Sequence, residues 1–410
     1  MSNQNLMKAL LEGVAVEWKA LGEVLVRTKG TKITASEMKV LHKDGAPLKI
    51  FAGGKTIAFF DFTDIPKKDI NTEPSIVVKS RGNIEFEYYD KPFSHKNEMW
   101  SYHSQNEFIH VKYLYHFLKM NEPYFQNLGS KMQMPQIATP DTDKYPVPVP
   151  CPDNPKKSIE IQSEIVRILD TFTELTAELT AELTARKKQY TYYRDQLLTF
   201  EEGQVEWKAL GDVCVNVSSG GTPLSTQAEY YDGDIPWLRT QEVRFTDILD
   251  TDIKITKLGV VNSSAKWIPA NCVIVAISGA TAARSAINKI PLTTNQHCCN
   301  LEINPECANY RYVFHWVCKE HDNLKSLGQG PRCDLNSGII KNYPIPIPYP
   351  NDPKRSLAEQ TRIVAILDKF DTLTTSITSG LPREIELRQK QYEYYREMLL
   401  SFPKPEVEAA

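Results

Sequence analysis

The sequence lacks the features of a membrane, secreted or disulfide-rich protein. No apolar run approaches the roughly 18 residues that a membrane-spanning helix needs, so no membrane partner is expected. The N-terminal stretch MSNQNLMKALLEG has no apolar segment typical of a secretory signal, which predicts a cytoplasmic protein. The 8 cysteines include no C-x-x-C pair, which disfavours a zinc site and a disulfide framework.

A strong charge of either sign is also missing. The formal net charge is -3 over 410 residues. Nucleic-acid-binding domains are often strongly basic, so the overall charge gives no support to DNA binding, and only local patches could supply it. With 41% hydrophobic and 24% charged residues, the composition is that of a globular protein with room for two or three domains.

Catalytic motifs are absent from the sequence. Gly53–Thr56 resembles the end of a phosphate-binding loop, but Lys49 stands where the upstream glycine is needed. Asp141 and Lys144 belong to a segment with the residue types of a metal nuclease, but no predicted strand supports it. There is no H-E-x-x-H, G-x-S-x-G or G-x-G-x-x-G motif. We therefore expect no active site, bound metal or cofactor in this chain.

An internal duplication organises the chain, and its clearest part is a long helix. IVRILDTF at 165–172 returns as IVAILDKF at 363–370, and KQYTYYRDQLLTF at 188–200 returns as KQYEYYREMLLSF at 390–402. Apolar residues spaced three and four apart form one stripe of a helix, so we expect the two copies to bury this seam against each other. The predicted seam residues are Ile165, Ile168, Phe172, Leu175 and Leu179, and Ile363, Ile366, Phe370, Leu373 and Ile377.

The two helices differ in length and continuity. The sequence Thr-Ala-Glu-Leu occurs twice at 176–183, and each such unit adds about 6 Å of helix, which makes it a length adjuster. Gly380 and Pro382 predict a stop and restart in the second helix. Ser158 and Ser356 are the candidate N-caps, and Ser356 also has the spacing of a capping box.

The duplication extends to the globular halves, which are of α+β class. VEWKALGEV at 16–24 recurs as VEWKALGDV at 205–213. Short β-branched runs predict strands at Ser75–Lys79 and Cys272–Ile277, and apolar periodicity predicts a helix near Tyr113–Leu118. Between such shared anchors the halves diverge, which is typical of one frame that reads two different targets.

Polar side chains follow the predicted strands in both halves. Arg and Lys suit phosphates and guanine edges, and Asn and Gln suit adenine edges. Each segment alone is typical of a solvated loop, but matching placement in both halves favours DNA binding. The first-half candidates are Lys79, Ser80, Arg81, Asn83, Lys131 and Gln133. The second-half candidates are Ser219, Gly220, Thr222, Arg239, Thr240, Gln241, Ser278, Arg284, Asn295, Gln296, Gln329 and Arg332.

This layout resembles the DNA-specificity subunit of type I restriction–modification systems. The resemblance rests on the Tyr343–Pro348 run followed by 358–370, and on the same block before the central helix. The repeated Thr-Ala-Glu-Leu resembles the repeat of one subfamily, in which the number of these units varies. Gly220–Pro223 and Thr294–Gln296, with Ile235-Pro-Trp237, resemble motifs of target-recognition domains, and the first half has no clear versions of them.

The resemblance implies a non-catalytic subunit with two target-recognition domains in pseudo-twofold repeat, separated by two long antiparallel coiled-coil helices. The domains are expected at 1–150 and 205–348, and the helical arms at 151–204 and 349–410, the second arm kinked near 380–382. Each domain would read one half of a split site in double-stranded DNA. Two methyltransferase subunits would dock on the helices and bind S-adenosylmethionine, and restriction subunits would use ATP and magnesium.

Two other functions remain open at this point. One is a stand-alone nuclease or methyltransferase, which the missing motifs disfavour. The other is a coiled-coil scaffold with no DNA role, supported by the net charge of -3. Against the scaffold stand two complete globular halves with divergent interiors.

Overall fold

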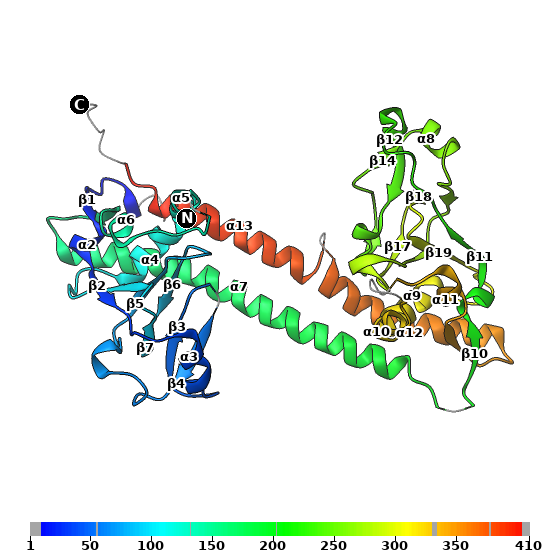
Figure 1. Ribbon diagram of the computed structural model, residues 1–410, viewed down its shortest axis with the longest axis horizontal. Coiled ribbons are helices and arrows are strands. Elements are labelled where there is room, and N and C mark those ends of the chain that lie inside the picture. The colour runs from blue at the N-terminus through cyan, green and yellow to red at the C-terminus, as the bar shows by residue number, and fades with distance from the viewer. Residues whose placement is uncertain are drawn as a thin grey trace. The chain divides into compact units, whose positions relative to one another are not determined.

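The computed structural model describes residues 10–54, 56–131, 133–201, 203–329, 334–376 and 379–403. The chain divides into two compact units. Unit 1 comprises 1–178 and 386–410, and unit 2 comprises 179–385. Both boundaries fall inside helices, so each unit contains the N-terminal part of one long helix and the C-terminal part of the other (Figure 1).

Unit 1 holds two small sheets besides a two-stranded pair. The first has the order β2-β8-β5-β6 and is antiparallel throughout; the second has the order β4-β3-β7, with β3 and β7 parallel. The strands are β2 (Val26–Lys29), β3 (Leu48–Phe51), β4 (Ile57–Phe60), β5 (Ser75–Lys79), β6 (Glu85–Tyr89), β7 (Phe93–His95) and β8 (Trp100–His103). The helices are α2 (Leu21–Val24), α3 (Ala35–Leu41), α4 (Val111–Met120), α5 (Glu122–Gly129) and α6 (Thr139–Asp143).

Unit 2 repeats this plan with longer sheets. Its orders are β11-β19-β16-β17-β13 and β14-β12-β18-β15, and the parallel pair β12–β18 matches β3–β7. The strands are β11 (Cys214–Ser219), β12 (Tyr231–Leu238), β13 (Asp247–Ile248), β14 (Lys254–Ile255), β15 (Trp267–Ile268), β16 (Val273–Ala276), β17 (Ser285–Asn288), β18 (Leu292–Thr294) and β19 (Cys298–Ile303). The helices are α8 (Lys257–Val261), α9 (Tyr310–Lys319), α10 (His321–Ser326) and α11 (Ser337–Lys341).

The proline-rich runs are edge strands in two-stranded sheets. Strand β9 (Pro146–Pro150) pairs with β1 (Val16–Ala20), and β20 (Pro344–Pro348) pairs with β10 (Val205–Ala209). A proline has no N–H to donate, so a strand with alternate prolines suits a position with a neighbour on one side only. Each of these strands has one neighbour. The two pairs carry each half of the chain into its long helix.

The long helices are α7 (Pro155–Leu197), α12 (Pro353–Thr375) and α13 (Leu381–Leu400). The predicted break is present between α12 and α13, where Gly380 has φ +105° and Pro382 lies in the first turn of α13. The predicted N-caps are wrong. Both helices begin earlier, at prolines, and Asp352 caps α12 by accepting from the Arg355 N–H.

Ser158 and Ser356 instead lie buried inside the first turns of α7 and α12. Each hydroxyl accepts from a buried glutamine one turn later, Gln162 or Gln360, at 2.9 and 3.1 Å. The oxygen of each glutamine in turn accepts the N–H at the start of α4 or α9. A proline at the first helical position leaves no N–H unpaired there, which explains the earlier start.

Several of the predicted seam residues pack on a globular half as well as on the other long helix. Ile165 and Ile168 lie in the core of unit 1 among residues of α4, together with Leu399 and Leu400 from the end of α13. Ile363 lies in the corresponding core of unit 2 with Leu198 near the end of α7. These buried seam residues thus pack on their own globular half and on the repeated C-terminal segment of the other long helix.

Aromatic stacking continues this antiparallel pairing within each unit. Phe172 stacks on Tyr395 at 5.0 Å between ring centroids in unit 1, and Phe370 stacks on Tyr193 at 5.4 Å in unit 2. Leu175, Leu179, Ile366 and Leu373 are half-buried, and Ile377 lies outside the described residues. Among the described helices, none is long and apolar enough to cross a membrane.

Candidate nucleic-acid interface

Three segments of unit 2 that are far apart in sequence meet at the ends of β11, β12 and β18. The Gly221 N–H donates to the Thr294 carbonyl at 2.9 Å, and the Trp237 indole N–H donates to the Gly221 carbonyl at 3.0 Å. The Asn295 N–H donates to the Leu238 carbonyl at 3.0 Å. The loops that begin at Ser219, Arg239 and Asn295 are therefore held beside one another.

The polar side chains of these loops are partly or fully exposed. The Thr222 hydroxyl donates to the side-chain oxygen of Gln296, and this bond fixes the orientation of the Gln296 amide. Gln241 is exposed and Thr240 half-buried, whereas Asn295 is 8% exposed and accepts the His297 N–H. Ser219 is bonded to Ser337 at 3.0 Å, so Ser219 and Asn295 position the loops while Thr222, Gln241 and Gln296 face outward.

Arg239 is the main cation at this end of β12. Its Nε atom is buried and has no hydrogen-bond partner among the described residues, with Glu242 Oε1 3.6 Å away and Asp252 Oδ2 4.0 Å from Nη2. A buried, unsatisfied donor costs free energy, and the two nearby carboxylates offset that cost in part. Arg239 is thus a partly exposed cation that Glu242 and Asp252 hold beside these loops.

A second pair of loops adjoins the first group. The Leu335 N–H donates to the Ile277 carbonyl at 2.8 Å, and the Gly279 N–H donates to Asp334 Oδ1 at 2.9 Å. The Ile277 N–H in turn donates to the His297 carbonyl at 2.9 Å. These bonds place the loop of Ser278 and Arg284, both half-buried, beside the loop of Gln329 and next to Gln296. Arg332 lies outside the described residues.

Unit 1 brings the matching loops together in the same way. The Ile137 N–H donates to the Ser80 carbonyl at 3.0 Å, and the Gly82 N–H donates to the Pro135 carbonyl at 2.8 Å. These bonds place one loop beside the other. The exposed candidate residues on them are Arg81, Asn83, Lys131 and Gln133. The loops after β5 and α5 are thus held together as the loops after β16 and α10 are, by the bonds Ile137–Ser80 and Leu335–Ile277.

Two first-half candidates lie inside the protein. Lys79 is 8% exposed and pairs with Glu85 at 3.1 Å and Glu87 at 2.8 Å. Burial lowers the pKa of Lys79, but hydrogen bonds to Glu87 and Glu85 outweigh burial and raise it overall. Ser80 is buried and donates to the Glu98 carbonyl. Both residues hold the hairpin and loop in place and neither faces outward.

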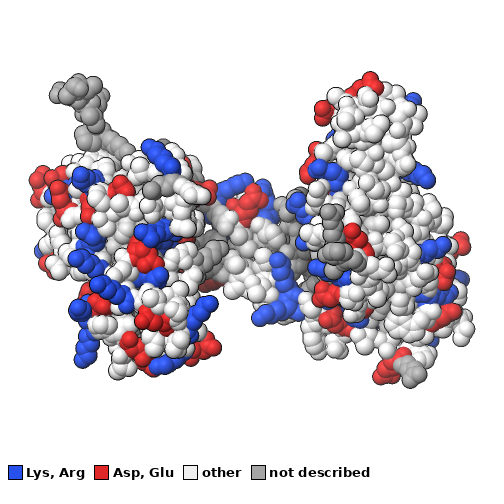
Figure 2. All heavy atoms as spheres, viewed as in Figure 1, with Lys and Arg blue, Asp and Glu red and all other residues white. Residues whose placement is uncertain are grey.

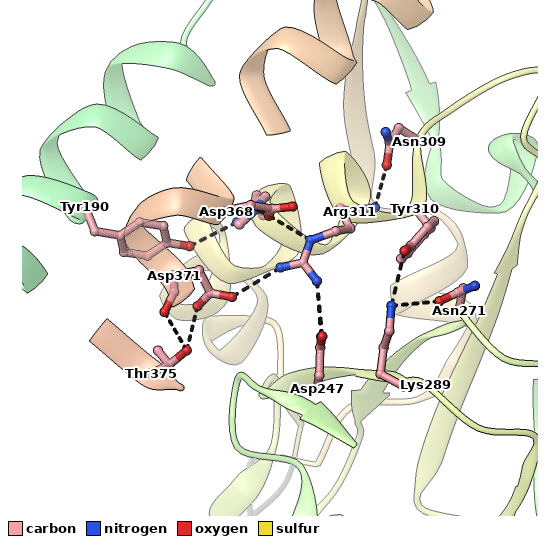
Figure 3. Close-up of polar contacts among 11 residues, drawn as sticks. Tyr190, Asp247, Asn271, Lys289, Asn309, Tyr310, Arg311, Asp368, Asp371 and Thr375 are labelled. Carbon is pink, nitrogen blue, oxygen red and sulfur yellow. Dashed lines mark hydrogen bonds and ion pairs between the residues drawn. The ribbon is translucent and has the colours of Figure 1, made fainter. Parts of the chain in front are cut away.

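A second duplicated polar arrangement lies where the long helices meet the globular halves. In unit 2, His315 Nε2 lies 2.7 Å from Asp368 Oδ1, and its Nδ1 lies 3.1 Å from the Tyr190 hydroxyl. Arg311 places its guanidinium among the carboxylates of Asp247, Asp368 and Asp371, as Figure 3 shows. In unit 1, His116 contacts Asp170 and Tyr392 in the same order, at 3.1 and 3.2 Å.

These residues tie the long helices to the globular halves. His315 is fully buried. Burial raises the pKa of Asp371, whereas hydrogen bonds from His315 and Arg311 outweigh burial and lower the pKa of Asp368.

Cationic and acidic side chains are interspersed over the face of unit 1 seen in Figure 2. Among the described residues no group of three His, Cys, Asp or Glu side chains is arranged to hold a metal ion.

Comparison with known proteins assigns this architecture. The family model described as type I restriction modification DNA specificity domain matches twice, at residues 16–186 and 203–387. The chain belongs to this family. The specificity subunit of the Escherichia coli type I restriction enzymes EcoR124I and EcoR124II is 39% identical over 99% of both chains. A putative specificity subunit of Haemophilus influenzae is 29% identical over 98% of this chain and 99% of its own.

Solved structures agree with this specificity-subunit fold. The S subunit of a type I system from M. genitalium aligns with a TM-score of 0.63 at 15% identity, over 96% of this chain and 98% of the other. A chain from a structure on the assembly and conformational transition of a type I system aligns with a TM-score of 0.55 at 13% identity, over 94% and 97%. As a specificity subunit, the chain is a DNA-recognition component and not an enzyme.

The specificity subunit also has first-half counterparts of the second-half motifs, which the sequence comparison missed. They lie at 30–32, 50–52 and 95–97, where the backbone makes the same bonds as at 220–222, 237–239 and 294–296. The side chains share no identity beyond one glycine, so a motif search does not find them. The spacing that relates Lys112–Leu118 to Arg311–Val317, extended upstream, would have aligned His95 with Thr294.

Proposed function

We propose that this specificity subunit reads a split site in double-stranded DNA, with residues 1–150 reading one half-site and 205–348 the other. The observation that carries this proposal is the repeated loop geometry. In unit 1 the loop after β5 is held against the loop after α5 by the Ile137–Ser80 bond. In unit 2 the loop after β16 is held against the loop after α10 by the Leu335–Ile277 bond. The same frame with different side chains is suited to reading two different sequences.

The subunit acts in a complex with catalytic partners. We assign the two long-helix regions, 151–204 and 349–410, to the docking of two methyltransferase subunits, because they share the closely matching segments 165–172 with 363–370 and 188–200 with 390–402, while the loops diverge. S-adenosylmethionine would be bound by those subunits, and ATP and magnesium by restriction subunits in the full complex. The name of the E. coli relative, a type I restriction enzyme specificity subunit, supports this assignment of partners.

Adenine methylation mapped across the genome tests this function. In cells that carry this chain with its cognate methyltransferase, we expect a split motif to be methylated, with fixed bases on either side of an unread spacer. Deleting the gene for this chain should remove methylation from that motif and from no other. A methylation pattern that is the same with and without the chain would contradict the proposal.

Inserting a third Thr-Ala-Glu-Leu unit after Leu183 should change the spacer and leave both half-sites unchanged. The unit lies within the continuous helix α7 and adds about 6 Å along it, compared with about 3.4 Å per base pair. We expect the methylated motif to gain one or two unread base pairs. A matched substitution of Thr180-Ala-Glu-Leu183 by Ala-Ala-Glu-Leu, which keeps the length, should leave the spacer as it is. An unchanged spacer after the insertion would refute the length-adjuster role.

A further inference from the structure

The two recognition domains have a glycine at an equivalent place in their backbones. A Cβ atom added to Gly30 would lie 2.2 Å from the His95 carbonyl oxygen, and one added to Gly220 would lie 1.8 Å from the Thr294 oxygen. The next N–H group donates to that same carbonyl, at 2.8 Å from Thr31 and at 2.9 Å from Gly221. Gly30 and Gly220 are therefore equivalent positions.

The parallel strand pairs extend this equivalence. Phe51 lies beside His95 in β3–β7, and Leu238 lies beside Thr294 in β12–β18. The following N–H groups close the same bond, from Lys96 to the Phe51 carbonyl at 2.9 Å and from Asn295 to the Leu238 carbonyl at 3.0 Å. This fixes the correspondence residue by residue through this segment.

Even the side chains at the strand ends make corresponding bonds. His95 Nε2 lies 3.2 Å from the Ser101 hydroxyl, and the Thr294 hydroxyl accepts from Asn300 at 2.8 Å. Ser101 and Asn300 occupy matching places, opposite Thr28 and Ser218 respectively. Two unlike polar pairs thus hold the same turn in the two domains.

The correspondence places Lys32 where the second domain has Thr222, and Asn97 where it has Gln296. Both Lys32 and Asn97 are exposed. Lys96, which matches Asn295, is 21% exposed and held by Glu98 at 2.8 Å. The turn therefore presents one exposed cation and one exposed amide.

The turn also adjoins the first-half loops already described. The Ser80 hydroxyl donates to the Glu98 carbonyl, so the loop of Arg81 and Asn83 begins next to Asn97. Burial raises the pKa of the Glu98 carboxyl, but the Lys96 hydrogen bond and, less strongly, the charge of Arg81 outweigh burial and lower it. Lys32, Asn97, Arg81 and Asn83 therefore belong to one polar end of unit 1.

We propose that Asn97 reads a base of the first half-site and that Lys32 contacts the DNA beside it. The inference rests on the proposed function and names residues of that site that sequence motifs do not mark. An exposed carboxamide suits the donor–acceptor edge of adenine in the major groove. A flexible exposed lysine suits a phosphate, which contributes affinity without base preference. Lys96 is a positioning residue that holds the turn.

The test uses the assembled methyltransferase complex, with methylation mapping in cells and DNA-binding titrations on the methylated site in vitro. Asn97→Ala should relax the preference for one base of one half-site by about 5- to 150-fold, the range for a good bidentate contact. Lys32→Ala should weaken binding to matched and mismatched sites alike, and lower the slope of log Kd against log salt by about 0.9. Gln296→Ala and Arg239→Ala should affect only the other half-site.

Lys91→Ala is the matched control, since Lys91 is an exposed cation at the far end of β6 from these loops and should leave the salt slope unchanged. Hydrogen exchange of each variant shows whether unit 1 keeps its fold. If the wild-type chain directs methylation to a split site but folded Asn97→Ala complex retains full discrimination at both half-sites, the inference is overturned and the proposed function stands. A wild-type chain that directs no split-site methylation overturns both.

Discussion

Replacing Arg311 by alanine should lower the free energy of unfolding of unit 2 by about 3 kcal/mol, because three carboxylates would lose a cation that they share. The guanidinium lies 2.7 Å from Asp368, 3.2 Å from Asp371 and 3.2 Å from Asp247. Its side chain is 15% exposed and so is that of Asp371, which limits screening by water. Burial lowers the pKa of Arg311, but the hydrogen bond and charge of Asp368 outweigh it.

Hydrogen exchange read by mass spectrometry assigns this loss to a unit and to elements within it. Faster exchange in α9 and α12 is expected for Arg311→Ala, since Arg311 lies on α9 and two of its partners lie on α12. Arg362→Ala is the control: Arg362 lies on α12, pairs with Glu359 at 2.7 Å and is 54% exposed, so its loss should cost under about 1 kcal/mol. Equal effects of the two substitutions would contradict a structural role for the Arg311 cluster.

Gly220→Ala should remove recognition of the second half-site and destabilise unit 2 by about 3 kcal/mol, the upper part of the range for overpacking. The added methyl group would lie 1.8 Å from a main-chain oxygen, which has no side-chain freedom to move away. Relief requires breaking the 2.9 Å bond from Gly221 to Thr294. Thr222 and Gln296 would then separate from each other and from Arg239.

Gly338→Ala is the control in the same unit. Gly338 lies in helix α11, and its new Cβ would meet only the Asn336 side chain, at 3.0 Å. Alanine is also the better helix former, so the free energy of unfolding should change by less than about 1 kcal/mol. Chemical unfolding and methylation mapping of both variants measure the two effects. Normal second half-site methylation by Gly220→Ala would show that the loop does not need this close approach.

Those parts of the fold that depend on local chemistry were predictable from the sequence. The strands at Ser75–Lys79 and near Cys272–Ile277 and the helix around Tyr113–Leu118 are present, as is the break at Gly380. Each has a short-range cause: β-branched runs, an apolar stripe, or a glycine before a proline. The tandem α+β plan followed from repeated anchors.

Packing partners were less accessible to sequence reasoning. The heptads of Ile165 and Ile363 fit a two-helix seam, but a heptad only states which face is apolar and not what covers it. Here α4 and α9 cover those faces, together with the repeated helix ends that carry Leu399 and Leu198. The exposed loops could be proposed from composition, whereas the burial of Lys79 depends on Glu85 and Glu87 across a hairpin.

The division of the chain into units has a consequence for synthesis on the ribosome. Unit 2 is continuous in sequence, from Leu179 to Ile385, whereas unit 1 needs residues from both ends of the chain. Leu399 and Leu400, both fully buried in the core of unit 1 with Ile165, are made only after the whole of unit 2. The first domain to leave the ribosome is therefore the last to complete its core, and chain termination before residue 399 leaves it with an uncovered apolar face.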